Sequence, residues 1–353
     1  VALFGLSTGT AGAAQARATS IGGGGLQLPR GFVSVAFTAN GSVTQPDDIT
    51  RLDHNLFVAY QNGVGSKGEP AANGQTESTV VEFAPWGSEL ASWNVVGKVD
   101  GMTADPAGHR IIATVDEDGN TSLYTIALRG WRSTVTHYTY DQNPLPHGGG
   151  TDSIAILHGS IYITASAPSP DANGTTYRGP ALYRATLSGT TATVTPVLMD
   201  NSTAVDATTG KTVTLNLSDP DSSTIVPKSA PRFGGDLVLD SQADGEQIYI
   251  ANPGTPQQTN TVLPLSTQVD DTAFASEQFG TLYVTDNSTN KIYAIYGPFQ
   301  EGQVFTAVAN DATVMPGTLG LLDLQTGAIT AWAPMTNPHG LLYVPNDWAR
   351  AED

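Results

Sequence analysis

The sequence predicts an all-β fold made of short antiparallel strands, and three observations lead to this prediction. The 353 residues include 38 Gly and 22 Pro, which leave little room for long helices. Short runs rich in β-branched and aromatic residues recur at Leu56–Tyr60, Arg110–Val115, Ser160–Thr164, Gln247–Ala251 and Thr281–Thr285. Dipeptides that favour positive φ and tight hairpins lie between such runs, at Asn40-Gly41, Asn62-Gly63, Asp118-Gly119, Asp244-Gly245 and Thr326-Gly327.

The composition excludes several classes of protein. The chain carries 15 Lys and Arg against 33 Asp and Glu, a net charge of −18, so it lacks the cationic surface that nucleic acids and anionic membranes require. With 14% charged and 39% hydrophobic residues it should fold rather than stay disordered. The absence of Cys excludes disulfides, thiolate metal sites and cysteine nucleophiles. No run approaches the roughly 20 apolar residues of a membrane span.

The first 28 residues differ from the rest. They are largely apolar or Gly/Ala, and the four glycines 22–25 form a hinge-like end. Two interpretations remain open: residues 1–18 are the remnant of a secretory signal, with cleavage candidates near Ala16 and Ala18, or residues 1–28 are an arm of the mature protein. Either interpretation predicts export and an extracellular location.

A shorter strand precedes most of the longer runs and opens with a polar residue. Six such openings occur, at Asp48, Asp100, Asp152, Asp236, Asp271 and His339. The first two intervals are 52 residues each, close to the roughly 40–50 residues of a four-stranded unit. Residues 29–346 are therefore expected to form a six-bladed β-propeller of four-stranded antiparallel blades, with five or seven blades as alternatives and an insertion at about 200–232.

Closure of the ring involves both chain ends. The run Phe32–Phe37 has no partner strands nearby in the sequence, and the last inner strand begins at His339. Pairing of N- and C-terminal strands in one blade would leave no exposed sheet edge. The polar residues 347–353 are expected to form a peripheral tail.

Two segments carry a resemblance to a known group of proteins. Residues 100–116 and 337–342 resemble inner-strand segments of six-bladed propellers of the NHL, streptogramin-lyase and gluconolactonase kinds. The resemblance implies a fold and, in the gluconolactonase kind, a metal in the channel held by a Glu, two Asn and an Asp. The corresponding positions here carry Asp and His, and no Glu opens the first blade. Of the His and Glu that streptogramin lyases use, only His339 is carried over.

The six openings are expected to converge on one mouth of the channel. The carboxylates of Asp48, Asp100, Asp152, Asp236 and Asp271 would suit a hard cation, with Ca²⁺ as the first candidate. The alternative is that they accept hydrogen bonds from the backbone of neighbouring blades. His339, and His147 just upstream of Asp152, are candidate general bases.

These features predict two functions from different classes. The first is a secreted, non-catalytic β-propeller for binding or structural self-assembly, in which residues 1–28 contact a neighbouring copy to form a homo-oligomer or filament. The second is a metal-dependent, lactonase-like hydrolase or lyase with its site at the channel mouth.

Overall fold

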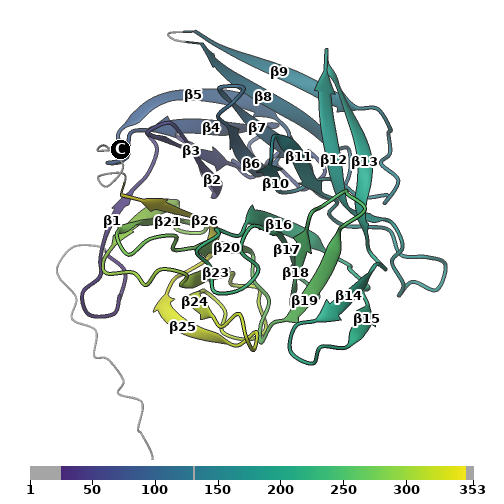
Figure 1. Cartoon of the computed structure of the whole chain (residues 1–353). Helices are drawn as coiled ribbons and strands as arrows, with labels where there is room; N and C mark the ends of the chain where they lie inside the picture. Colours follow the sequence, from purple (N-terminus) through teal and green to yellow (C-terminus); the bar gives the residue numbers. More distant parts are fainter. Residues whose placement is uncertain (1–24, 130–131, 347–353) are drawn as a thin grey trace, which may run out of the picture.

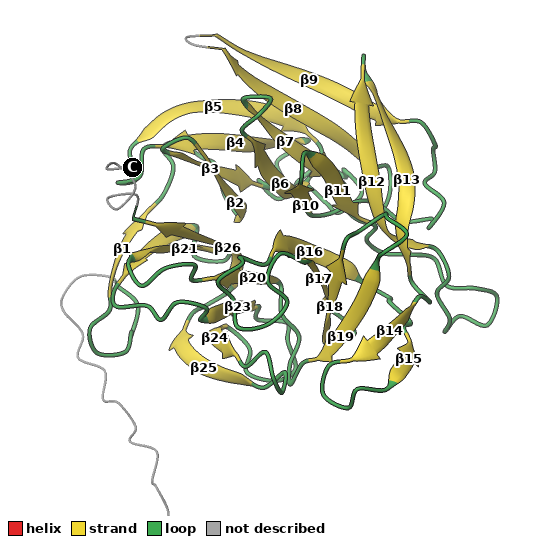
Figure 2. Cartoon of the chain, viewed as in Figure 1, coloured by secondary structure: helices red, strands yellow, loops and turns green. Residues whose placement is uncertain are grey.

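The computed structural model describes residues 25–129 and 132–346, and all regular structure in these residues is β-strand (Figures 1 and 2). Twenty-six strands form five sheets arranged around a central pocket, as in a β-propeller. Among the described residues no helix is long and apolar enough to cross a membrane.

The first sheets are simple meanders. One contains four antiparallel strands in sequence order: β2 (Pro46–Leu52), β3 (Asn55–Tyr60), β4 (Glu77–Phe83) and β5 (Glu89–Val96). An eight-stranded sheet consists of two further meanders: β6 (Val99–Asp105), β7 (Arg110–Val115), β8 (Ser122–Arg129) and β9 (Arg132–Tyr140), then β10 (Ile154–Leu157), β11 (Ser160–Thr164), β12 (Pro180–Ser188) and β13 (Thr191–Met199). Among the described residues, the one ladder between these two meanders is a two-residue parallel contact between β9 and β13, so each meander keeps its own antiparallel core.

The six-stranded sheet combines a meander with a hairpin. Its meander is β16 (Pro220–Ile225), β17 (Leu237–Ser241), β18 (Glu246–Ala251) and β19 (Thr259–Pro264), and the hairpin is β14 (Thr203–Asp206) and β15 (Thr212–Thr214). The hairpin joins the outer edge through β14 and β19. The insertion expected at 200–232 therefore does not lie wholly outside the meanders, because it contains β16.

The last two sheets exchange strands. The chain leaves β20 (Asp271–Phe274) to form β21 (Gly280–Asp286) and β22 (Lys291–Tyr296) in the neighbouring sheet. It then returns to pair β23 (Val304–Val308), β24 (Thr318–Leu322) and β25 (Ile329–Pro334) with β20. Finally β26 (Pro338–Pro345) pairs with β21, which completes the neighbouring sheet.

Both described chain ends contribute to this last sheet. Its order is β1-β22-β21-β26, where β1 (Val33–Phe37) is the outer edge. The expectation that the two terminal strands pair directly is wrong, because β21 and β22 lie between them. A hairpin contributed by the middle of the C-terminal half supplies the hydrogen-bonding partners for both.

The turn predictions are confirmed. Gly41, Gly63, Gly119, Gly245 and Gly327 all have positive φ, between 62° and 140°. Each follows a strand-like run, so the local sequence fixed where the chain reverses.

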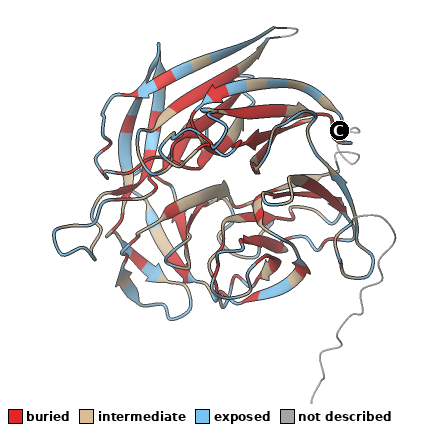
Figure 3. Cartoon of the chain, turned by 180° about the vertical axis from the view of Figure 1, so that it is seen from behind, coloured by how far each residue is buried: buried red, intermediate tan, exposed pale blue. Residues whose placement is uncertain are grey.

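Buried residues concentrate on the inner strands of the sheets (Figure 3). Apolar side chains of adjacent sheets pack against one another in shared core clusters. Phe57 and Val80 of the first sheet pack with Ile111 and Ile126 of the next. On the opposite face of the first sheet, Phe83 belongs to a second cluster that includes Tyr283 and Ile292. Because the sheets pack against each other in this way, both faces of the inner strands are buried. The first residues of these strands are thereby held in place around the pocket.

The N-terminal arm is described only from residue 25. Residues 1–24, like the tail 347–353, lie outside the described residues. Leu28 is buried in the core cluster that contains Leu282 and Phe299, and Leu26 packs against the same cluster. The described end of the arm is therefore in contact with this chain's own sheets.

Candidate functional site

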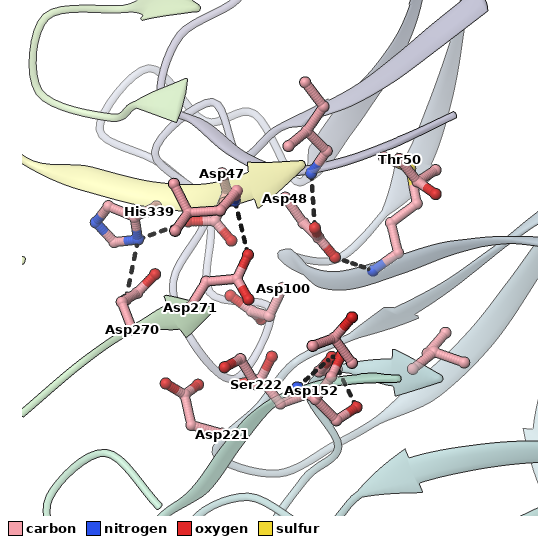
Figure 4. A pocket seen from close by; sticks show the side chains of 18 of the residues that line it. Asp47, Asp48, Thr50, Asp100, Asp152, Asp221, Ser222, Asp270, Asp271 and His339 are labelled. Carbon is pink, nitrogen blue, oxygen red and sulfur yellow. Dashed lines mark hydrogen bonds and ion pairs between the residues drawn. The ribbon is translucent and has the colours of Figure 1, made fainter. Parts of the chain in front are cut away.

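A pocket of about 560 Å³ lies where six strands begin (Figure 4). The strands are β2, β6, β10, β16, β20 and β26, and each contacts the next in this order, with β26 also contacting β2. The first five of these strands each begin a meander. The sixth, β26, is an edge strand of the sheet that also contains β1, β21 and β22. The pocket is thus surrounded by strands from every sheet.

One residue at the start of each strand lines the pocket, and the six together are here called the acidic ring. The acidic ring consists of Asp47, Asp100, Asp152, Asp221, Asp270 and His339. Hydrogen bonds between adjacent strands fix the equivalence of these positions. Met102 donates its backbone N–H to Asp48, Ser223 to Ser153 Oγ (3.0 Å), and Leu341 to Asp271 (2.6 Å). The same spacing holds in all three bonds. The acceptor is the residue that directly follows a ring member, and the donor lies two positions after the ring member of the next strand.

At three of the six ring positions, the residue after the ring member therefore joins neighbouring strands. Asp48 also accepts the N–H of Ile49, and Asp271 that of Thr272, so both oxygens of each carboxylate are used by the backbone. At two places this residue is glycine, Gly101 and Gly340, and the neighbouring backbone comes too close for a side chain. These contacts match the structural alternative considered for the aspartates.

Five of the six residues predicted to converge do line the pocket: Asp48, Asp100, Asp152, Asp271 and His339. The register differs by one position at two strands, where Asp47 and Asp270 hold the ring positions. Asp236 does not line the pocket. It precedes β17, the second strand of its meander, and the ring position of that sheet is Asp221 on β16. For a pair such as Asp47-Asp48, the sequence does not indicate which of the two carboxylates faces the channel.

His339 lies between the carboxylates of its two ring neighbours. Its Nδ1 is 3.0 Å from Asp47 Oδ1 and 3.3 Å from Asp270 Oδ1. Burial disfavours the imidazolium, but Asp270 and Asp47 outweigh it and raise the pKa of His339 to about 9. A protonated ring donates from both nitrogens, so Asn337, whose amide lies 2.8 Å from Nε2, then has to present its oxygen. At neutral pH His339 is a cation and a poor general base.

Asp100 lies beside the second cation of the pocket. Its Oδ1 accepts hydrogen bonds from Lys98 Nζ (2.7 Å) and Gln61 Nε2 (3.0 Å), and Lys98 also contacts Glu117. Asp100 is 7% exposed, and its Oδ2 has no hydrogen-bond partner among the described residues. Burial and Glu117 raise the pKa of Asp100 against the opposing effect of Lys98. A buried carboxylate oxygen without a donor is costly, and a ligand at the pocket would supply one.

Asp152 and Asp221 are the ring members of the adjacent strands β10 and β16, and their carboxyl groups interact. Burial raises the pKa of both groups, and the charge of Asp152 raises the pKa of Asp221 further. Interacting carboxyl groups in such an environment can act as acid and base.

The sequence predicts that Ca²⁺ is held by the carboxylates of Asp48, Asp100, Asp152, Asp236 and Asp271. Within residues 25–129 and 132–346, no group of three His, Asp or Glu side chains is arranged to hold a metal ion. Lys98 and His339 engage ring carboxylates, and Asp48 and Asp271 are bonded to the backbone. Calcium binding stays a prediction. To bind Ca²⁺, several ring carboxylates would have to turn toward one point.

His147 lies away from the pocket lining. It is 2% exposed, with Nδ1 2.9 Å from the Tyr183 hydroxyl and Nε2 2.7 Å from the Gly150 carbonyl. Burial lowers its pKa to about 4, so it is neutral at physiological pH. His147 stands five residues before Asp152, and this position in the sequence suggested that it lies near the pocket. The loop of three glycines between the two residues instead directs His147 toward Tyr183 on β12.

Beyond the ring the pocket wall is partly apolar. Side chains two and four positions after a ring member share its face of the strand. Met102, Ile154, Ile156 and Ile225 line the pocket at such positions. A ligand would therefore meet carboxylates at one level and hydrocarbon at the next.

No protein-family model matches the sequence, and no curated protein matches it. Among solved structures, the chain is similar to one described as a streptogramin B lyase structure, with 12% identity, a TM-score of 0.44, and coverage of 89% of this chain and 95% of that one. It is also similar to a periplasmic gluconolactonase from Pseudomonas aeruginosa (13% identity, TM-score 0.40, coverage 85% and 88%) and to a protein from Lactobacillus plantarum (10%, 0.47, 86% and 89%). These neighbours include the lyase and gluconolactonase kinds that residues 100–116 and 337–342 resemble.

Proposed function

We propose that this chain is a six-bladed β-propeller that binds a small organic cation at the acidic ring. The six blades are the first meander, the two meanders of the eight-stranded sheet, the meander of the six-stranded sheet, and the two sheets that exchange strands. The ring then contributes one side chain from each blade. Binding, rather than catalysis, was also the first function predicted from the sequence.

The observation that carries this proposal is the unpartnered Oδ2 of Asp100. The oxygen belongs to a buried carboxylate that lines a pocket of about 560 Å³, a volume typical of small-molecule sites. The remaining ring carboxylates outnumber the cations Lys98 and His339. An ammonium or guanidinium group would donate to Asp100 and reduce this excess of negative charge.

The size of the ring favours an organic cation over a bare metal ion. Ca²⁺ needs six to eight oxygens at about 2.3–2.6 Å from one point. The five ring carboxylates come from five different strands around the pocket, and among the described residues they do not converge in threes. A larger cation with several N–H donors can reach separated carboxylates without moving the strands.

The test is calorimetric titration of the full chain with 1,4-diaminobutane, and separately with Ca²⁺. Diamine binding is expected, and Asp100→Asn should weaken it about tenfold, since a hydrogen bond to a charged group contributes about 1.5–3 kcal/mol. Asp53→Asn is the matched control, because Asp53 is exposed and does not line the pocket, and its positive φ suits Asn. Binding of Ca²⁺ but not of the diamine would contradict the proposal and support the calcium prediction.

A second candidate function, hydrolysis, is favoured by the position of Asp152 and Asp221, two interacting carboxyl groups with raised pKa values that line the pocket on adjacent strands. In this role Asp152 would take a proton from water while Asp221 donates one to the carbonyl oxygen of the substrate. The expected result is hydrolysis of p-nitrophenyl acetate above the buffer rate, reduced about 100-fold or more in Asp221→Asn. Equal rates for Asp221→Asn and Asp53→Asn would exclude the pair from catalysis. Secretion and self-assembly through residues 1–28 stay predictions of the sequence.

A further inference from the structure

We infer that the acidic ring selects oligoamines, in which two or three ammonium groups are separated by methylene chains. This inference rests on the proposed binding of an organic cation and specifies its chemical class. It depends on how the excess negative charge is distributed around the ring and on the apolar wall next to it. The unpartnered Oδ2 of Asp100 is the independent observation that points to a donor at this site.

The ring divides into three groups of interacting side chains. Asp47 and Asp270 lie on either side of the cation His339. Asp100 and Glu117 both contact the cation Lys98. Asp152 and Asp221 interact with each other across the adjacent strands β10 and β16.

Each group has more carboxyl groups than cations: two against one in the first two groups, and two against none in the third. The groups follow one another around the channel in strand order, so these surplus carboxyl groups lie apart rather than together (Figure 4). Asp48 and Asp271 add little to them, because their oxygens are already occupied by backbone N–H groups. A monoamine can satisfy one group, whereas a triamine can satisfy all three.

The apolar part of the pocket wall is the second feature that favours an oligoamine. Met102, Ile154, Ile156 and Ile225 line the pocket next to the ring. Methylene chains that connect ammonium groups would cover this apolar surface and gain from leaving water. A hydrated metal ion or a guanidinium ion without an alkyl chain would leave it exposed.

The test compares butylamine, 1,4-diaminobutane and spermidine by calorimetry on the full chain at one pH and salt concentration. Affinity is expected to rise about tenfold with each added ammonium group. Asp100→Asn, Asp221→Asn and Asp270→Asn change one group each, and each should weaken spermidine binding about tenfold. Asp53→Asn should leave binding unchanged, and melting curves check that every variant is folded.

The outcomes separate this inference from the proposed function. Equal affinities for butylamine and spermidine would overturn the selection of oligoamines while leaving the cation site in place. Spermidine affinity that depends on Asp100 but not on Asp221 or Asp270 would have the same consequence. Failure of all three amines to bind would overturn the proposed function itself.

Discussion

The folded chain is expected to be more stable at pH 5 than at pH 8, and its melting temperature should be higher at pH 5 by roughly 5 °C or more. A change of 1 kcal/mol in the free energy of unfolding shifts the melting temperature by about 2–4 °C. Burial raises the pKa of Asp48 to about 8 and of Asp200, Asp270 and Glu246 to about 7. The unfolded chain loses these protons near pH 4, whereas the folded chain keeps them up to about pH 7–8. Between these limits the folded state binds more protons, so its stability falls as the pH rises.

The two perturbed histidines act in opposite directions and do not reverse this trend. The pKa of His339 is raised to about 9, so its contribution is complete below about pH 6.5 and is lost as the pH rises through 9. The pKa of His147 is lowered to about 4, so its contribution is lost as the pH falls below about 6.5. The four raised carboxyl groups outnumber His147, and the net effect favours acid.

Thermal melting from pH 5 to pH 8 checks the prediction, with Asp200→Asn as the informative variant. Asp200 is fully buried and neither carboxylate oxygen has a partner among the described residues. A neutral amide removes the cost of ionising this group, so Asp200→Asn should melt higher than the parent chain at pH 8 and close to it at pH 5. A melting temperature that rises from pH 5 to pH 8 would show that the buried carboxyls ionise normally.

Replacing Gly101 by alanine is expected to destabilise the fold by about 3 kcal/mol or more, at the upper end of the range for overpacked sites. A Cβ on Gly101 would lie 2.6 Å from Ser153 Cα and still closer to the Asp152 carbonyl, both of which belong to the backbone just before the neighbouring strand β10. Backbone cannot move aside as a side chain does, so β6 and β10 would have to separate. Gly340→Ala should have a similar effect, because its Cβ would lie 3.0 Å from Asp48 Cα.

Urea unfolding measures this loss, and Gly159→Asn is the control. Gly159 has φ of 77° and nothing within 4 Å of an added Cβ, and Asn tolerates this conformation. The control should differ from the parent chain by about 0.5 kcal/mol or less. Normal stability of Gly101→Ala would mean that the inner strands are not packed as closely as described.

The local sequence was sufficient for most strands and turns. The five strand-like runs all form strands within one residue of their expected bounds, and the five Gly turns all have positive φ. The sequence also placed Asp100, Asp152 and His339 at one site. These predictions succeeded because alternation of apolar residues and the conformational freedom of glycine are properties of short segments.

The sequence alone could not locate β16 or the exchange between the last two sheets. The polar opening at Asp236 looks like the others, yet it begins the second strand of its meander, and β16 lies in a Ser- and Asp-rich segment that reads as a loop. β20 pairs with β23, more than thirty residues on, rather than with the adjacent β21. Such pairings depend on which sheets face each other, and no short segment contains that information.

The all-β character, the turns and the concentration of aspartates at strand starts follow from the amino-acid sequence, whereas the packing of neighbouring strands selects which carboxylates face the channel. At Asp47-Asp48 and Asp270-Asp271 either residue could have faced the pocket. Side chains alternate between faces, so a shift of one residue exchanges the two roles. The choice is made by the next strand, whose backbone N–H at Met102 or Leu341 binds the second aspartate and leaves the first in the ring.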